Sequence, residues 1–209
     1  MATTPAKENI LKKIRQALSN PVPLPFPESE GVESVYKSAE EDEAIIFAEE
    51  FTKLQGKFAF CADEADLYTQ LHLLIKERGW VNIYCQDDKF IPFLTNAEIT
   101  PYPNLSTCDV SITGCEYLIA RTGTMVLSAA QQSGRTTSVY APVHICIAYS
   151  SQMLYDIKEA LVFLKEKYSN NFPSFITFAS GPSRTADIEK TLVTGVHGPK
   201  EVYCFLIEA

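Results

Sequence analysis

Short apolar runs alternate along this chain with segments of helical periodicity, and this alternation constrains the fold more than any other feature. The runs KFAFC (57–61) and WVNIYC (80–85) are separated by Leu67, Leu71, Leu74 and Ile75, which are spaced to lie on one helix face. Parallel strands need a long crossover connection, and a helix is the usual one. The order strand, helix, strand therefore predicts an α/β fold with a mostly parallel sheet.

Three helices are expected in the first half of the domain. The first follows a capping box formed by Ser38 and Glu41. The second begins at Asp63 and ends at Gly79, and a short third helix covers residues 87–95.

The second half of the chain is richer in predicted strands. We expect strands over 108–113, 124–128, 143–148, 175–178 and 201–207, and a helix over 154–168. The strands near the start of this half are not separated by helical patterns. They predict a β-rich excursion around residues 114–141, attached to the parallel sheet.

The N-terminal segment reads as an appendage. Ile10, Leu11 and Ile14 form the apolar stripe of a helix, and four prolines alternate over residues 21–27. Alternating prolines favour an extended, polyproline-like strap. We expect residues 1–28 to be a helix and strap, free to pack on the same chain, a sister subunit or another protein, and residues 29–209 to be a single domain.

The charge balance excludes some partners. Lysine and arginine total 18 against 26 acidic residues, which gives a net charge of −8. Such a field repels nucleic acid and anionic lipid, so we expect neither as a partner. No apolar run is long enough to cross a membrane and no secretory signal is recognisable, which predicts a cytoplasmic protein.

The six cysteines have no spacing suited to a metal. None forms a C-x-x-C pair, and most lie inside apolar runs, which is typical of buried free thiols. We expect no metal site and no iron–sulfur cluster in this chain.

Three polar loops follow or link predicted strands. Ligands bind outside the carboxyl ends of strands in open parallel sheets, so these loops are expected to converge on a cleft. Guanidinium groups bind oxyanions in two-pronged fashion, which favours a small anionic ligand such as a carboxylate, a phosphate or a nucleotide. The candidate ligand-binding residues are Thr113, Gly114, Arg121, Thr122, Gly123, Thr124, Arg135, Gly181, Ser183, Arg184, Thr185, Asp187, Gly195, His197 and Gly198.

Structural explanations exist for some polar residues. A local ion pair at a helix start accounts for Arg184 and Asp187 as well as ligand contact does. His144 lies in an apolar strand and is expected in the core, and His72 is expected on the surface. His197, in the glycine-flanked segment 195–198, lies outside the apolar runs that would explain it as a core residue.

Familiar catalytic signatures are missing. The chain has no G-x-G-x-x-G, no P-loop, no G-x-S-x-G and no H-E-x-x-H, so catalytic residues and cofactors stay unassigned. If the protein is an enzyme, Asp187, Glu116 and His197 are the candidates for nucleophile or base.

Four motifs resemble the lactate-utilization protein C family, also called LUD-domain proteins. They are TGCEYLIARTGTMVL (113–127), PVHICIA (142–148), GPSRTADIE (181–189) and GVHGP (195–199). The resemblance implies a Rossmann-like fold of the sugar-phosphate isomerase and coenzyme A transferase type. It also implies a cluster-free accessory role in bacterial oxidation of L-lactate to pyruvate, beside iron–sulfur partner proteins.

One position departs from the family pattern. Arg121 stands where the family usually has glutamate within Ala-Glu-Thr-Gly-Thr. An arginine cannot attack an acyl group as a carboxylate can, so the change favours oxyanion binding over acyl transfer. The alternatives are a free-standing transferase or isomerase, and a non-catalytic module whose N-terminal helix docks on an iron–sulfur protein.

Overall fold

The computed structural model describes residues 5–19, 42–188, 191–195 and 197–208. The chain divides into two compact units, residues 1–38 and 39–209. The proline strap lies outside the described residues, as does the domain boundary expected after residue 28, so both stay predictions.

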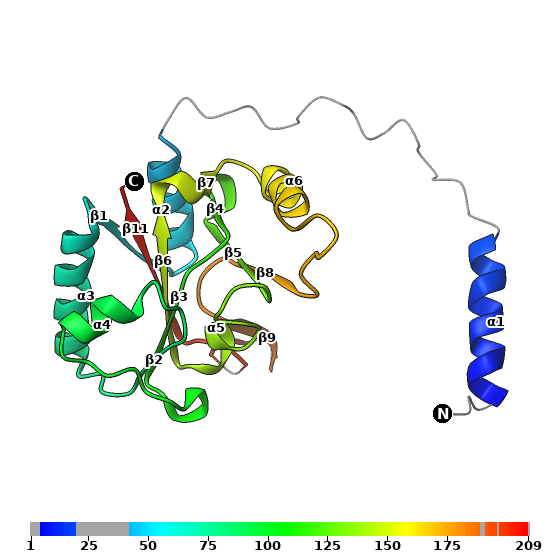
Figure 1. Cartoon of the computed structure of the whole chain (residues 1–209), viewed down its shortest axis with the longest axis horizontal. Helices are drawn as coiled ribbons and strands as arrows, with labels where there is room; N and C mark the ends of the chain where they lie inside the picture. The colour runs from blue at the N-terminus through cyan, green and yellow to red at the C-terminus, as the bar shows by residue number, and fades with distance from the viewer. Residues whose placement is uncertain (1–4, 20–41, 189–190, 196, 209) are drawn as a thin grey trace. The chain divides into compact units, whose positions relative to one another are not determined.

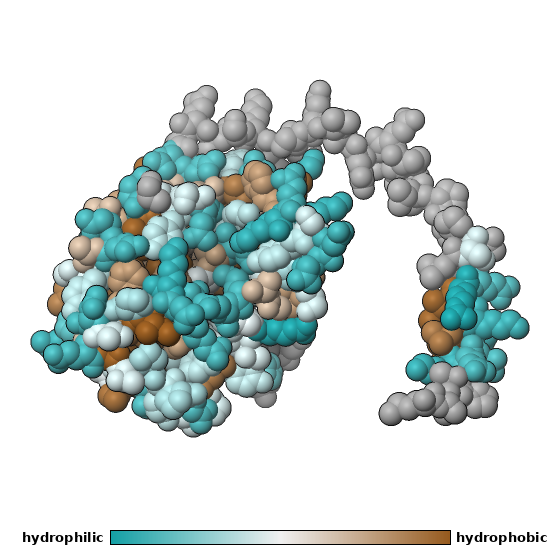
Figure 2. Space-filling model, in the orientation of Figure 1, coloured by the Kyte–Doolittle hydropathy of each residue, from teal (hydrophilic) through white to brown (hydrophobic). Residues whose placement is uncertain are grey.

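The smaller unit contains one amphipathic helix. α1 runs from Pro5 to Ser19, as predicted. Ile10 is 59% exposed and Ile14 48% exposed, and Figure 2 shows the apolar atoms of this helix gathered on one side. This helix, taken by itself, therefore carries an apolar stripe on one side.

A five-stranded sheet forms the centre of the larger unit (Figure 1). Its order is β1 (Lys57–Cys61), β11 (Glu201–Ile207), β6 (Val143–Tyr149), β3 (Val110–Thr113) and β2 (Ile83–Cys85). Every neighbouring pair is parallel, which confirms the predicted parallel α/β sheet. Because β1 and β2 lie at opposite edges, the helix that joins them must cross the whole sheet.

That helix covers one face of the central sheet. α3 runs from Glu64 to Arg78, with Asp63 as its N-cap and Gly79 as its left-handed C-cap, as predicted. It packs its buried leucines on the sheet together with α4 (Ile91–Asn96). The buried residues of this cluster include Leu67, Leu71, Ile75, Leu94, Ile145 and Phe205.

The opposite face carries α2 (Glu43–Lys53) and a second sheet. The order of the second sheet is β7 (Met153–Leu154), β4 (Tyr117–Ile119), β5 (Thr124–Ser128) and β8 (Ile176–Ala179). Its inner residues pack with α2 on the central sheet, and α6 (Ile157–Tyr168) packs on its outer side. The predicted β-rich excursion is thus present, but its sheet also takes in β7 and β8 from later in the chain.

α2 begins one residue after Asp42, whose Oδ1 accepts a hydrogen bond of 2.8 Å from the Ala44 N–H. The expected capping residues Ser38 and Glu41 lie outside the described residues. Phe47 and Phe51 on this helix are fully buried, as its predicted apolar face requires.

The polar segment expected as a loop leading into a helix at Asp187 is a hairpin instead. β9 (Arg184–Ile188) pairs antiparallel with β10 (Thr191–Thr194). The β-branched residues of both segments favour strands, and the glycine and proline at 181–182 obscured that pattern. The expected helix-start ion pair between Arg184 and Asp187 therefore has no helix to form on.

All six cysteines are buried and free, as expected. Burial raises the pKa of Cys61 to about 12 and that of Cys85 to about 11. These two thiols therefore stay protonated and act as small apolar side chains.

Gly123 should be the glycine of this fold that least tolerates a side chain. Its φ is +54°, and an added Cβ would lie 2.3 Å from the Phe51 nitrogen of α2. Gly134 has a similar φ of +64° but nothing within 4 Å. Alanine at either position costs about 1 kcal/mol for the left-handed backbone, and Gly123→Ala should cost a further 1–3 kcal/mol or so because α2 must move.

Urea unfolding of Gly123→Ala and Gly134→Ala measures the difference directly, since only the contact with α2 separates them. Equal losses of unfolding free energy would show that α2 does not pack on this turn.

Candidate functional site

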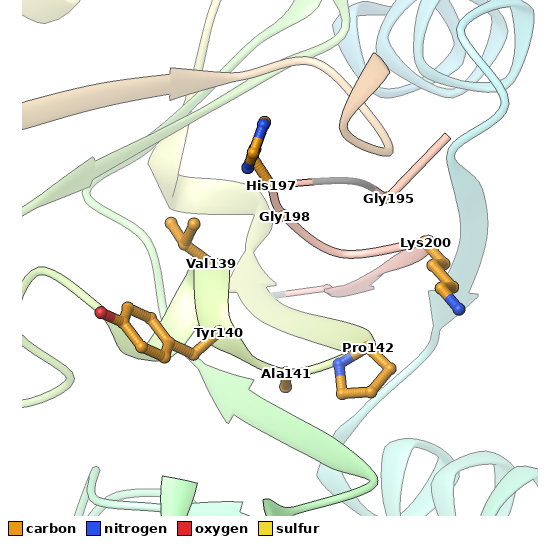
Figure 3. Close-up of a pocket in the computed structure, with 8 residues that line it drawn as sticks. All are labelled: Val139, Tyr140, Ala141, Pro142, Gly195, His197, Gly198 and Lys200. Atoms are coloured by element: carbon orange, nitrogen blue, oxygen red, sulfur yellow. The ribbon is translucent and has the colours of Figure 1, made fainter. Parts of the chain in front are cut away.

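Two adjoining cavities lie where the 180–183 and 195–200 loops meet α5 (Thr137–Tyr140). The outer cavity, of about 410 Å³, is lined by Val139, Tyr140, Ala141, Pro142, Gly195, His197, Gly198 and Lys200 (Figure 3). The inner cavity, of about 300 Å³, extends towards β8 and the central sheet, and it shares Val139, His197 and Gly198 with the outer one.

Backbone contacts hold the two loops together. The Ser183 N–H donates to the Pro199 carbonyl at 3.0 Å, and the Gly195 N–H donates to the Ser183 carbonyl at 2.8 Å. A Cβ on Gly198 would lie 2.8 Å from the Ser183 Cβ, so only glycine allows this approach. The GPSR and GVHGP motifs therefore form one structural unit.

This unit lies at the amino edge of the central sheet, not at the carboxyl edge expected from parallel sheets in general. Lys200 directly precedes β11, and its N–H donates to the carbonyl of Pro142, which directly precedes β6. The motif order alone could not reveal this, because it depends on β11 pairing with β6.

The polar groups of the outer cavity suit an anion. His197 and Lys200 are exposed and lie at the two ends of the 197–200 segment. Their side chains point away from each other (Figure 3). In the described part of the chain, no carboxylate lines either cavity. In a protein of net charge −8, two cavities lined without carboxylates are places where an anion meets little local repulsion.

The inner cavity reaches His144, which is 1% exposed. The Nε2 atom of His144 lies 2.8 Å from Thr113 Oγ1. Burial lowers the pKa of His144 to about 4, so the ring is neutral at physiological pH. The expectation of a buried, hydrogen-bonded core residue is confirmed. That His144 also lines a cavity could not be predicted from its position in an apolar strand.

Several expected site residues gather at these cavities. Gly181, Ser183, His197 and Gly198 line the inner cavity, and Gly195 lines the outer one. Others reach the inner cavity only through a neighbour. Thr113 does so through His144, and Thr124 through Ser180, whose Oγ lies 2.6 Å from Thr124 Oγ1. Thr122 in turn bonds Thr124 at 2.7 Å.

The three candidate arginines do not come together. Arg121 Nε donates to Asp156 Oδ2 at 2.7 Å, Arg135 donates to Ser174 Oγ, and Arg184 donates to the Leu54 carbonyl. In the described residues, none of them lines either cavity. Each guanidinium instead connects its loop to another part of the fold, which sequence alone could not show.

The remaining candidates either lie apart from the cavities or have side chains outside the described part of the structure. Gly114 packs against Phe90 at the end of β3, and Gly123 packs against α2. Thr185 and Asp187 belong to β9, but their side chains are outside the described part of the structure. His72, expected on the surface, is half-buried, and its Nδ1 has no hydrogen-bond partner among the described atoms.

Glu116, a candidate nucleophile, is held by three donors. It is 4% exposed and accepts hydrogen bonds from Lys167 Nζ at 2.8 Å, from Tyr168 Oη at 2.7 Å and from Ser128 Oγ. Burial alone would raise the pKa of Glu116, but these hydrogen bonds outweigh it and the pKa is lowered. The carboxylate thus joins α6 to the second sheet.

The described residues contain no helix long and apolar enough to cross a membrane. They also contain no group of three or more His, Cys, Asp or Glu side chains that could hold a metal ion.

Replacing Glu116 by glutamine should lower the unfolding free energy by about 2–3 kcal/mol at pH 7, because charged donors lose a buried charged acceptor. A carboxyl with a lowered folded-state pKa stabilises above its unfolded pKa and loses that contribution as pH falls through the folded value. The wild type should therefore lose more stability than Glu116→Gln between pH 5 and pH 3 or so. Glu50→Gln, at a surface pair with Lys53, should change stability by less than about 1 kcal/mol.

Urea unfolding of the three proteins over this pH range makes the comparison. Identical pH slopes for wild type and Glu116→Gln would show that Glu116 is not the stabilising carboxylate.

Comparison with known protein families gives a match to the LUD domain over residues 93–207. A lactate utilization protein C of Shouchella clausii is 28% identical over 190 residues, covering 83% of this chain and 82% of that protein. A lactate utilization protein C of Halalkalibacterium halodurans is 37% identical over 101 residues, covering 47% of this chain and 44% of that protein. An uncharacterized protein of Neisseria meningitidis is 33% identical over 123 residues, covering 58% of this chain and 52% of that protein.

In most of these alignments the chain spans about half the length of the curated relatives it matches. Among solved structures, a DUF162 family protein from Deinococcus radiodurans superposes with a TM-score of 0.59 at 19% identity, covering 80% of this chain and 99% of that one. The structural likeness supports the fold described above.

Proposed function

This chain belongs to the LUD domain family, and on that premise we propose that it is a cluster-free accessory protein of bacterial lactate utilization that binds a small carboxylate at the two cavities. The name shared by its relatives supports the pathway. The observation that carries the ligand class is the meeting of the GPSR and GVHGP motifs around cavities with His197 and Lys200 but no described carboxylate.

A carboxylate fits this place for electrostatic reasons. His197 offers ring N–H donation at the boundary of both cavities, and Lys200, which lines the outer cavity alone, adds a positive charge at that cavity. The net negative charge of the protein opposes anion binding in general, so an anion should bind most favourably at the cavities, whose described lining has no carboxylate.

The proposal concerns binding and not acyl transfer. An acyl-transfer mechanism needs a free carboxylate nucleophile. Glu116 already accepts three hydrogen bonds, and Arg121 occupies the position where the family usually has glutamate. The transferase alternative therefore has less support than carboxylate binding.

Calorimetric titration with lactate and with pyruvate tests the site. His197→Ala should weaken binding about tenfold, the loss expected for one hydrogen bond to a charged group. Lys200→Ala should weaken it less, because its ammonium points away from His197 (Figure 3). Lys53→Ala removes the same charge at an exposed pair with Glu50 and should leave affinity unchanged.

Two results would contradict the proposal. One is the absence of binding by either acid to the wild-type protein. The other is equal affinity in the wild type and His197→Ala.

We further propose that the protein works in the cytoplasm with iron–sulfur proteins and that α1 is the contact element. An accessory protein without a cluster needs a partner to move electrons. The exposed Ile10 and Ile14 give α1 an apolar stripe of the kind that docks in a groove.

Replacing Ile10 and Ile14 together by aspartate should abolish co-purification with such a partner while carboxylate binding persists, because charges on the stripe oppose its burial. The matched control replaces Asn9 and Gln16 by aspartate, which adds the same charge on the opposite side of α1. Co-purification of the stripe variant at the control's level would remove α1 from the interface.

A further inference from the structure

The inner end of the inner cavity is formed by a pair of buried polar side chains. His144 is 1% exposed and Thr113 is 0% exposed, and both project from the central sheet towards the second sheet. His144 lines the cavity, together with β8 and the 180–183 loop. A polar ring at this depth needs partners for both nitrogens.

Only one ring nitrogen has a partner in the described part of the chain. Nε2 faces Thr113 Oγ1 at 2.8 Å, and Nδ1 makes no hydrogen bond there. A neutral imidazole carries one N–H and one acceptor nitrogen. Burial keeps this ring neutral, with a pKa of about 4.

The threonine decides which nitrogen carries the proton. In the described residues, Thr113 Oγ1 has no hydrogen-bond partner other than His144. If it accepted from Nε2–H, its own hydroxyl proton would be buried without an acceptor, which is costly. Thr113 therefore donates to Nε2, and the ring proton lies on Nδ1.

We propose that His144 selects the ligand by donating a hydrogen bond from Nδ1–H to the carbonyl oxygen of a small 2-oxo acid, an inference that rests on the carboxylate binding proposed above. A carbonyl oxygen only accepts, which matches a single neutral donor. The carboxylate of the acid lies towards His197 and the 197–200 loop, because a charge next to a neutral buried ring would lose its hydration without a counter-charge.

The tautomer can be observed without any ligand. Two-dimensional proton–nitrogen NMR of the imidazole rings at pH 7 should show His144 protonated on Nδ1, with the signal assigned by its loss in His144→Phe. Thr113→Val should remove this preference while leaving the ring in place. A ring protonated on Nε2 in the wild type would overturn the inference.

The binding test compares pyruvate with propionate, which lacks the carbonyl oxygen. Wild-type protein should bind pyruvate about five- to tenfold more tightly, the effect of one hydrogen bond. His144→Phe should reduce this ratio to about one, and Thr113→Val should reduce it in part, whereas propionate affinity stays within about twofold. His72→Phe, on α3, should leave the ratio unchanged.

The outcomes separate the two proposals. Equal binding of pyruvate and propionate by wild type, or an unchanged ratio in both His144→Phe and Thr113→Val, overturns the role of His144 and leaves carboxylate binding intact. Failure of either acid to bind overturns both. If His144→Phe does not fold, Thr113→Val and the NMR measurement decide.

Discussion

The pairing of β11 between β1 and β6 is the interaction on which the rest of the structure depends. β11 pairs with β6 over seven consecutive residues, from Glu201 to Ile207. Its alternate residues serve two cores, since Tyr203, Phe205 and Ile207 face α3 while Val202, Cys204 and Leu206 face α2 and the second sheet. The last strand of the chain therefore joins both layers. It also fixes the preceding 195–200 loop at the amino edge, where the cavities form.

This dependence explains which parts of the fold could be predicted. Local signals were sufficient for α3, because Asp63 and Gly79 are strong caps around a regular apolar stripe. They were sufficient for the buried strands as well. Strand order was not accessible, because the position of β11 comes from long-range pairing that no local pattern encodes. The edge at which the motifs meet follows from that order, so the sequence pointed to the wrong edge.

The arginines show a second limit of the same kind. A guanidinium in a polar loop can bind an anionic ligand, but it can equally well form an ion pair with a carboxylate of the protein itself. Arg121 pairs with Asp156, and that carboxylate also accepts from the Lys158 N–H as the N-cap of α6. The Lys158 N–H first, and Arg121 after it, lower the pKa of Asp156. A glutamate at position 121 would face this carboxylate and repel it, so the arginine suits Asp156 in this chain.

His144 raises the question of why a polar ring is kept between two packed sheets. A hydrogen-bonded polar pair buried there contributes little more to folding stability than apolar residues of similar size would. The cost of removing both polar groups from water offsets most of the free energy of their hydrogen bond. The neighbouring Ser111 Oγ is satisfied by the Thr137 carbonyl at 2.7 Å, so it needs nothing further. The His144–Thr113 pair differs, because satisfying Thr113 places the remaining ring proton on the side without a described partner. Packing alone does not account for that arrangement, whereas a bound acceptor oxygen in the adjoining cavity completes it.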